Sequence, residues 1–199
     1  MTVQPSAPVK LVLATHNAHK VDELRRILGD RLDGIELVGY DGPEPVEDAD
    51  SFAGNALIKA RAAAKHTGLA AIADDSGISV DSLGGAPGIH SARYAGNRDD
   101  RENLELLLAN LAGSADRTAQ FNCAAAFVDG DFEHVEVGVW PGTVLETAAG
   151  DGGFGYDPVF RPEGLDVSAA ELTADEKNAI SHRARAFGQI VSVVRERLL

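Results

Sequence analysis

The chain has 199 residues, of which 44% are hydrophobic and 25% are charged. This is enough for one substantial α/β core and short for two independent ones. The 31 acidic and 18 basic residues give a formal net charge of −13, which disfavours binding to DNA or RNA because both are polyanions. A small phosphorylated ligand that is carried with a metal ion is compatible with this charge.

One cysteine and the absence of long apolar runs bear on the compartment. Cys123 excludes an internal disulfide and lies in an apolar run, which favours packing in a reducing compartment over a catalytic thiol. The first residues lack the pattern of a signal peptide, and no window approaches the roughly 18 to 20 apolar residues of a membrane span. We expect a cytoplasmic protein without membrane contact, with a flexible segment over residues 1–8 and one domain over residues 9–199.

Apolar periodicity predicts alternating strands and helices in the first part of the chain. Predicted strands cover 10–15, 35–38, 69–73 and 78–83, and predicted helices cover 17–28, 51–66 and 99–113. Further along, an Asp-Gly turn at 129–130 predicts a long hairpin that joins 118–128 to 133–144. A glycine-rich loop is expected over 148–164, a short helix over 168–172 and a longer helix over 179–198.

The segment Asp74-Asp75-Ser76-Gly77 follows a short apolar strand and precedes another. Adjacent carboxylates beside apolar strands are costly unless a cation or an exchangeable proton is used there. We interpret the segment as an acidic turn with a chemical role. A simple turn and cap pair is the less favoured interpretation because both carboxylates adjoin apolar strands.

Two further polar segments could join this acidic turn. Thr15, Asn17 and Lys20 lie where free backbone N–H groups begin a helix and favour an anion such as phosphate. Taken alone, however, these residues are better explained by an N-capped helix with a solvated lysine. Glu47 lies in an acidic loop that is a solvated loop when taken alone. If this loop meets Asp75 at one end of the sheet, Mg²⁺ could bridge the two carboxylates.

Aromatic and basic residues near the C-terminus suit a flat ligand. Phe154 lies among glycines that allow close approach of a base, and it is suited to stacking. Lys177, His182 and Arg183 offer donors near the last predicted helix. Each group alone has an ordinary explanation, as a turn or as solvated cations.

Taken in order, the motifs resemble those of the inosine triphosphate pyrophosphatase family, over about residues 11–190. The motifs are Ala-Thr-His-Asn-Ala-His-Lys at 14–20, Asn-Ala-Leu-Ile-Lys-Ala-Arg at 55–61, Ala-Asp-Asp-Ser-Gly at 73–77 and Gly-Gly-Ala-Pro-Gly-Ile-His-Ser-Ala-Arg-Tyr at 84–94. They continue with the segment 152–160, and with Ala-Ala-Glu-Leu at 169–172, Glu-Lys at 176–177 and Ser-His-Arg at 181–183. The family clears non-standard purine nucleoside triphosphates. The resemblance implies Mg²⁺-dependent hydrolysis of ITP, dITP and XTP at the α-phosphorus, a homodimer, and a long mixed β-sheet flanked by helices in two lobes with a nucleotide-binding cleft between them.

The resemblance also assigns roles to residues. It implies that Asp75 is the catalytic carboxylate and, with Glu47, a metal ligand. The substrate-binding residues that it implies are Thr15, His16, Asn17, Ala18, His19, Lys20, Ser76, Phe154, Gly155, Tyr156, Asp157, Lys177, His182 and Arg183. One departure is Gly54, where the family often carries a glutamate, so Asp48 or Asp50 could substitute in the metal shell.

Two other functions compete with this hypothesis. A related pyrophosphatase for pyrimidine or other modified nucleotides would keep the carboxylates and Lys20 but change the base pocket. A non-catalytic nucleotide-binding module would bind the ligand without releasing pyrophosphate, and it would gain nothing from Asp75 beside the phosphate segment.

Overall fold

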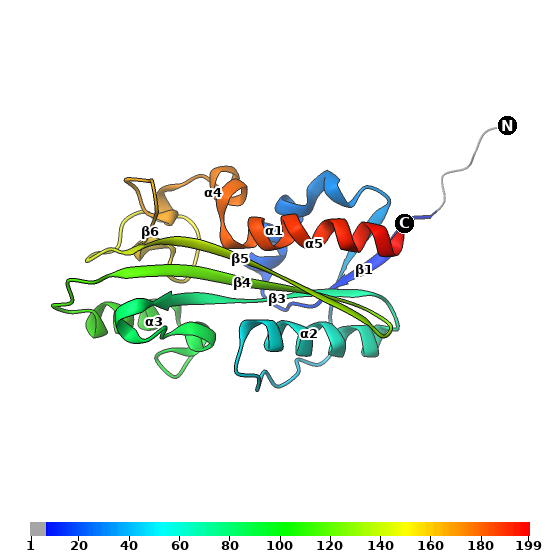
Figure 1. The fold of residues 1–199 in the computed structure, drawn as a ribbon, viewed down its shortest axis with the longest axis horizontal. Helices are drawn as coiled ribbons and strands as arrows, with labels where there is room; N and C mark the ends of the chain where they lie inside the picture. Colours follow the sequence, from blue (N-terminus) through cyan, green and yellow to red (C-terminus); the bar gives the residue numbers. More distant parts are fainter. Residues whose placement is uncertain (1–6) are drawn as a thin grey trace.

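A mixed six-stranded sheet with the strand order β2-β1-β3-β4-β5-β6 forms the centre of the computed structural model, which describes residues 7–199 (Figure 1). The strands are β1 (Val9–Leu13), β2 (Ile35–Gly39), β3 (Ala71–Val80), β4 (Thr118–Asp129), β5 (Phe132–Val144) and β6 (Phe160–Pro162). β1 runs parallel to β2 and β3, and the remaining neighbours are antiparallel. The predicted α/β class with a long mixed sheet is confirmed.

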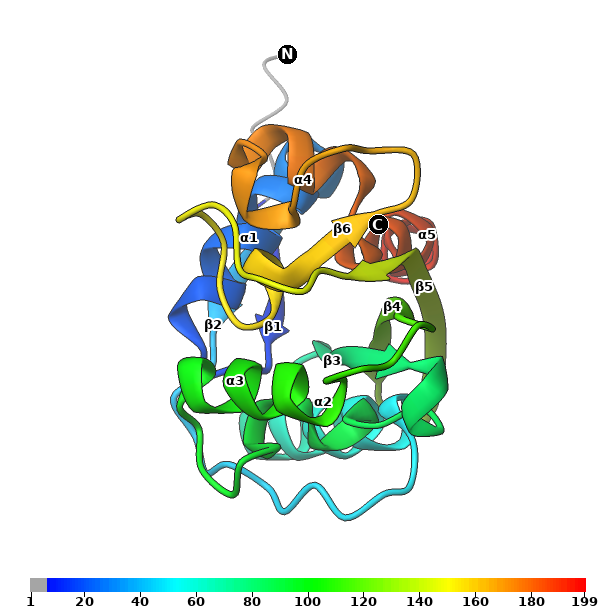
Figure 2. The same ribbon diagram turned by 90° about the vertical axis from the view of Figure 1, so that its left-hand side faces the viewer.

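Helices cover both faces of the sheet (Figure 2). One layer contains α1 (Ala18–Leu28), α4 (Ala174–Ile180) and α5 (His182–Leu198), and the other contains α2 (Phe52–Thr67) and α3 (Asp100–Asn110). The predicted caps begin these helices, since the side chains of Asn17 and Ser51 accept the backbone N–H groups of Lys20 and Gly54. Such caps satisfy backbone donors that the helix itself leaves free.

The side chains packed on one face of the sheet are smaller than those packed on the other. Under α2, Ala56, Ala60 and Ala63 pack against small residues of β3 and β4, so the helix approaches the sheet closely. On the opposite face, Phe127 and Phe187 belong to the bulkier cluster that α1 and α5 bury. A third cluster joins β6, α3 and the far ends of β3, β4 and β5.

Two predicted boundaries are wrong. The expected strands 69–73 and 78–83 are one strand, because β3 pairs with β4 without interruption from Ala71 to Val80. This continuous ladder overrides the poor strand propensity of the acidic segment. The expected helix 179–198 is divided between α4 and α5 by Ser181, whose extended backbone (φ −66°, ψ 165°) ends one helix while its hydroxyl caps the next.

Smaller features complete the described chain. The loop predicted over 148–164 contains the short strand β6, which pairs with the end of β5. The expectation of a flexible N-terminus concerns residues 1–8, of which residues 1–6 lie outside the described part. Across residues 7–199, every helix is too short or too polar to cross a membrane.

Candidate active site

A cavity of about 810 Å³ lies along one edge of β3. β1 pairs with β3 only through Val12↔Ala71 and Leu13↔Ile72, so β3 extends past the end of its neighbour. Within residues 7–199, no strand pairs with Asp74 to Gly77 on that side. The segment from Asp74 to Gly77, for which the sequence predicted a chemical role, therefore lies on an open edge of the sheet beside the cavity.

The cavity brings the predicted segments together. Its walls include Thr15, His16, Asn17, His19, Lys20, Glu47, Asp75, Ser76, Phe154, Gly155, Tyr156, Asp157, Lys177, His182 and Arg183. Ala18 begins α1, and its side chain is not among those that the structure describes. The acidic loop, the start of α1 and the start of α5 thus meet in one place although they are distant in sequence.

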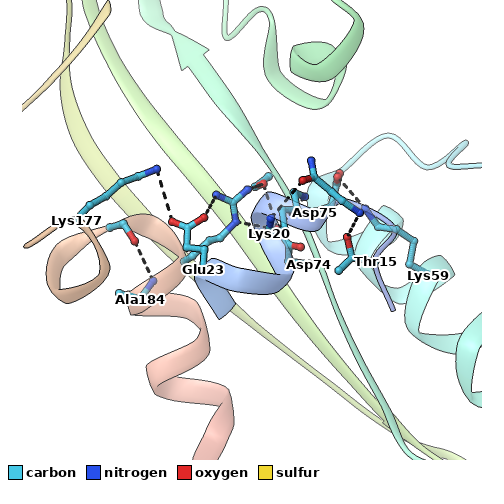
Figure 3. A network of polar contacts seen from close by, with 12 residues as sticks. Thr15, Lys20, Glu23, Lys59, Asp74, Asp75, Lys177 and Ala184 are labelled. Carbon is cyan, nitrogen blue, oxygen red and sulfur yellow. Dashed lines mark hydrogen bonds and ion pairs between the residues drawn. The ribbon is translucent and has the colours of Figure 1, made fainter. Parts of the chain in front are cut away.

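Asp74 and Asp75 point to opposite faces of the sheet (Figure 3). Side chains alternate along a strand, and here Asp74 meets Lys20 of α1 and Arg183 of α5, whereas Asp75 meets Asn55 and Lys59 of α2. The prediction of an acidic turn is therefore wrong. The two neighbouring carboxylates occupy separate environments, and their chemistry differs accordingly.

Asp74 is a buried anion held by cations. Its side chain is fully buried, and its Oδ2 accepts hydrogen bonds from Lys20 Nζ (3.0 Å) and Arg183 Nε (3.3 Å). Burial alone would raise the pKa of Asp74, but the charges of Lys20, Arg183 and Lys59 outweigh it and hold the pKa well below its usual range. A carboxylate this acidic does not take up a proton at neutral pH, so Asp74 acts as a fixed counter-ion.

Asp75 has the opposite electrostatic character. Its Oδ2 accepts from Asn55 Nδ2 (3.2 Å) and its Oδ1 from Lys59 Nζ (3.2 Å). Burial, assisted by the charge of Glu47, raises the pKa of Asp75 even though Lys59 opposes the shift. A carboxylate with a raised pKa at a cavity wall is suited to accept a proton from water.

Lys59 joins Asp75 to Glu47. Its ammonium lies 2.9 Å from Glu47 Oε2 and 3.2 Å from Asp75 Oδ1. Burial lowers the pKa of Lys59, but the charges of Asp75, Asp74 and Glu47 outweigh it and raise the pKa. Two carboxylates from separate segments thus converge on one cation.

This donor set fits Mg²⁺, which takes one or two protein carboxylates and completes its shell with water and substrate phosphate oxygens. Across residues 7–199, no group of three or more His, Cys, Asp or Glu side chains is placed to hold a metal by itself, so phosphate oxygens would have to contribute. Gly54 does not leave space for the glutamate often found there, because a Cβ atom on it would lie 2.5 Å from the Ala49 Cβ. The loop that carries Glu47 therefore packs directly against the start of α2.

The cavity wall also contains a buried histidine. His182 is 2% exposed, its ring stacks on Phe121 with centroids 4.8 Å apart, and its Nδ1 has no hydrogen-bond partner among residues 7–199. Burial and the charges of Arg183 and Lys177 lower the pKa of His182 well below its usual value. A neutral imidazole donates from only one of its nitrogens, so a ligand can meet either a donor or an acceptor here.

Buried ion pairs fix the basic residues around His182. Arg183 donates to Glu23 Oε2 (3.0 Å), to Asp74 and to Ser76 Oγ (2.7 Å), which uses three of the five N–H groups of a guanidinium. Lys177 Nζ donates to Asp157 Oδ2 at 2.6 Å. These cations are therefore pre-positioned by the protein and are not solvated, in contrast to the simple interpretation of the sequence.

Comparison with known proteins assigns the family. The model of the "Ham1 family" matches residues 11–193. The chain belongs to the Ham1 family. A relative from Leifsonia xyli subsp. xyli named "dITP/XTP pyrophosphatase" is 57% identical over 191 residues, which cover 94% of this chain and 96% of the relative. One from Streptomyces coelicolor with the same name is 54% identical and covers 95% and 98%.

Solved structures agree with this assignment. A HAM1 protein from Coxiella burnetii superposes with a TM-score of 0.86 at 40% identity, covering 94% of this chain and 99% of that one. The Staphylococcus aureus Ham1 protein gives a TM-score of 0.85 at 35% identity, with the same coverage of both chains. The predicted family, fold and enzyme class, a nucleoside triphosphate pyrophosphatase, are confirmed.

The Ham1 site contains residues that the sequence analysis missed as site residues. Asn55 and Lys59 were quoted within a motif without a role, although their i, i+4 spacing places them on one face of α2. Glu23 lies on α1, is buried, and pairs with Arg183 without lining the cavity itself. A carboxylate at this helical position has no distinguishing signal in the sequence, because only the tertiary contact with α5 reveals it.

Proposed function

We propose that this chain hydrolyses the non-standard purine nucleoside triphosphates ITP, dITP and XTP to the nucleoside monophosphate and pyrophosphate, with Mg²⁺. The observation that carries the proposal is the convergence of Asp75, Glu47 and Lys59 in the same cavity as Lys20 and Phe154. Carboxylates that can hold a metal, ammonium groups for phosphates and an aromatic ring for a base are thus available to one ligand. The name of the Leifsonia xyli and Streptomyces coelicolor relatives, dITP/XTP pyrophosphatase, supports the choice of substrate.

In this proposal the triphosphate lies along the open edge of β3. The start of α1 offers free backbone N–H groups to an anion, and Lys20 Nζ stands at 3.0 Å from Asp74, so its position is set before substrate arrives. Mg²⁺ bound by Glu47 and Asp75 would supply neutralisation of phosphate charge. Lys59, which contacts both carboxylates, would keep them from repelling each other.

The chemical step uses Asp75 as the base. Asp75 takes a proton from a water molecule, whose oxygen forms a bond to the α-phosphorus. The bond between this phosphorus and the oxygen that bridges to the β-phosphorus breaks, and pyrophosphate leaves with that oxygen. Attack at the α- rather than the γ-phosphorus is part of the proposal and follows from the names of the relatives.

Selection of the base would depend on His182 and Arg183. Donors from these residues suit the 6-oxo group of hypoxanthine or xanthine and leave the 6-amino group of adenine unpaired, a mismatch worth about 1–3 kcal/mol when buried. Guanine has the same 6-oxo group, so its exclusion requires a contact at the 2-position. This predicts a strong preference over ATP and a separate cause for any preference over GTP.

Release of pyrophosphate from dITP, XTP, ITP, GTP, ATP and a pyrimidine nucleotide, with Mg²⁺ and with EDTA, tests the proposal. We expect rapid release from dITP, XTP and ITP only, and only with Mg²⁺. Equal rates for ITP, XTP and GTP would contradict the substrate assignment, whereas a preference for the pyrimidine nucleotide would favour the alternative pyrophosphatase. Binding without release would favour the non-catalytic module.

We also propose a cytoplasmic homodimer. Val137 and Val139 of β5 are 51% and 36% exposed, which supports a further contact on this strand, and the buried thiol of Cys123 suits a reducing compartment. Light scattering coupled to size-exclusion chromatography measures the mass directly. A monomer of 20.9 kDa at micromolar concentration would contradict the dimer.

A further inference from the structure

His19 stacks on Phe154 at the end of the cavity that holds His182. The ring centroids are 5.7 Å apart and the planes differ by 19°, a near-parallel arrangement like that of a stacked aromatic pair. The two rings come from the first turn of α1 and from the glycine-rich loop before Pro158. A contact therefore joins the segment expected to bind phosphates to the segment expected to bind the base.

Phe154 is fixed in place. Its N–H donates to Asp157 Oδ2 (2.9 Å), and the N–H of the next residue, Gly155, donates to Asp100 Oδ2 (2.9 Å). Buried cations also approach its ring, with Lys177 Nζ at 4.9 Å from the centroid and Arg183 Cζ at 5.3 Å. The loop and the ring thus form a rigid wall.

His19, in contrast, is free to turn. Its side chain is exposed, and no hydrogen bond to its ring is found within residues 7–199. A ligand that stacks between two rings needs about 7 Å, twice the usual contact distance between carbon atoms, and the present separation is 5.7 Å. Because the imidazole is exposed, rotation about its side-chain bonds is the motion that would open this space.

We propose that His19 is the second wall of the base site, so that the purine lies between the His19 imidazole and the Phe154 ring. This inference rests on the proposed function and deepens it. Stacking depends little on which base is present, because every base has a π face. His19 therefore increases the affinity for the nucleotide and does not select among purines.

The test is the steady-state kinetics of His19→Ala with dITP and XTP. We expect KM to rise about tenfold for both substrates, which is within the range that one aromatic ring contributes to stacking, with kcat and the ratio of the two substrates unchanged. His19→Phe should restore KM to within about twofold of the wild type, because it restores a flat ring. Inorganic tripolyphosphate, which has no base, should inhibit His19→Ala and the wild type equally.

His134→Ala is a matched control. His134 also stacks on a phenylalanine, Phe132, with centroids 6.5 Å apart and planes at 7°, but it lies on the β4–β5 hairpin outside the cavity. This variant should keep the wild-type KM, and both alanine variants should keep the wild-type melting temperature because the two histidines are partly or fully exposed.

Three results would overturn the inference. An unchanged KM in His19→Ala would mean that the ring does not touch the base, and a lowered KM would mean that His19 only covers Phe154. Weaker inhibition by tripolyphosphate would show that His19 acts on the phosphates. If the wild type released no pyrophosphate from dITP or XTP, the proposed function itself would be wrong, which is a distinct outcome.

Discussion

Replacing Asp74 by its amide should destabilise the protein, whereas the same change at Asp75 should not. Asp74→Asn removes a fully buried charge that accepts hydrogen bonds from Lys20 and Arg183. Removing one partner of a buried ion pair costs about 3–5 kcal/mol. We expect the lower value, about 3 kcal/mol, because Arg183 keeps its pairing with Glu23 and Lys20 is partly exposed.

Asp75→Asn should leave stability unchanged or increase it. Since burial and Glu47 raise the pKa of Asp75, the folded protein favours its neutral form more than the unfolded chain does, and the amide is neutral. Activity should nevertheless fall by about 10²- to 10⁴-fold, the usual effect of losing a general base. The two variants thus separate structural from catalytic carboxylates at adjacent positions.

Thermal unfolding followed by circular dichroism, at pH 7 in EDTA, measures the difference. A loss of about 3 kcal/mol in Asp74→Asn corresponds to a melting temperature lower by about 6–12 °C for a chain of this size. The depressed pKa of Asp74 means that its stabilisation is present above the unfolded-state pKa of about 4 and is lost as the pH falls through the lower folded-state pKa. The penalty in Asp74→Asn should therefore persist at pH 5. Equal destabilisation of both variants, or full activity in Asp75→Asn, would refute this reasoning.

Three other outcomes follow from single contacts. Glu47→Gln should increase the Mg²⁺ concentration needed for half-maximal pyrophosphate release about tenfold or more, and an unchanged Mg²⁺ dependence would remove Glu47 from the metal site. Tyr156→Phe should lower the free energy of unfolding by about 1–2 kcal/mol in urea titrations, because the buried hydroxyl donates to the Ser91 carbonyl at 2.7 Å. Burial raises the pKa of the Cys123 thiol far above its usual value, so a thiol reagent at pH 8 should modify it only when the protein unfolds, and rapid labelling of the native protein would contradict this.

Helix starts and the tight hairpin turn were predicted correctly from the sequence. Asn17 and Ser51 cap the helices that they were expected to begin, and the Asp129-Gly130 turn joins β4 and β5 as expected. Caps and tight turns depend on side chains only a few residues apart, so the sequence contains the information.

The misassigned regions depend on distant partners. Asp74 to Gly77 lack strand propensity, but β4 supplies a continuous row of backbone partners, and such pairing is set by tertiary structure. Ser181 divides the C-terminal helix because its side chain caps α5, although alanine and polar residues on both sides favour one continuous helix.

The candidate site shows the same division. Each predicted segment contributes residues to the cavity wall. These segments could be predicted because their residue types suit phosphate, metal or base binding whatever the fold. The partners of those residues were not predicted: Lys59 meets Asp75 and Glu47 only after α2 packs on the sheet. The opposite orientations of Asp74 and Asp75 were also missed, because a turn and a strand place adjacent side chains differently.

The alternation along β3 constrains how the chain can change in length. Asp74 pairs with Ala125 and Asp75 with Ala124 in the ladder to β4, and a shift of one residue would turn every side chain of the strand to the other face. Asp74, which pairs with Arg183, would then face α2. Asp75, the proposed general base, would face Lys20 and Arg183 instead. Insertions and deletions among relatives should therefore fall outside Ala71–Val80 and its partner strand, and an alignment with a gap there pairs the wrong carboxylates.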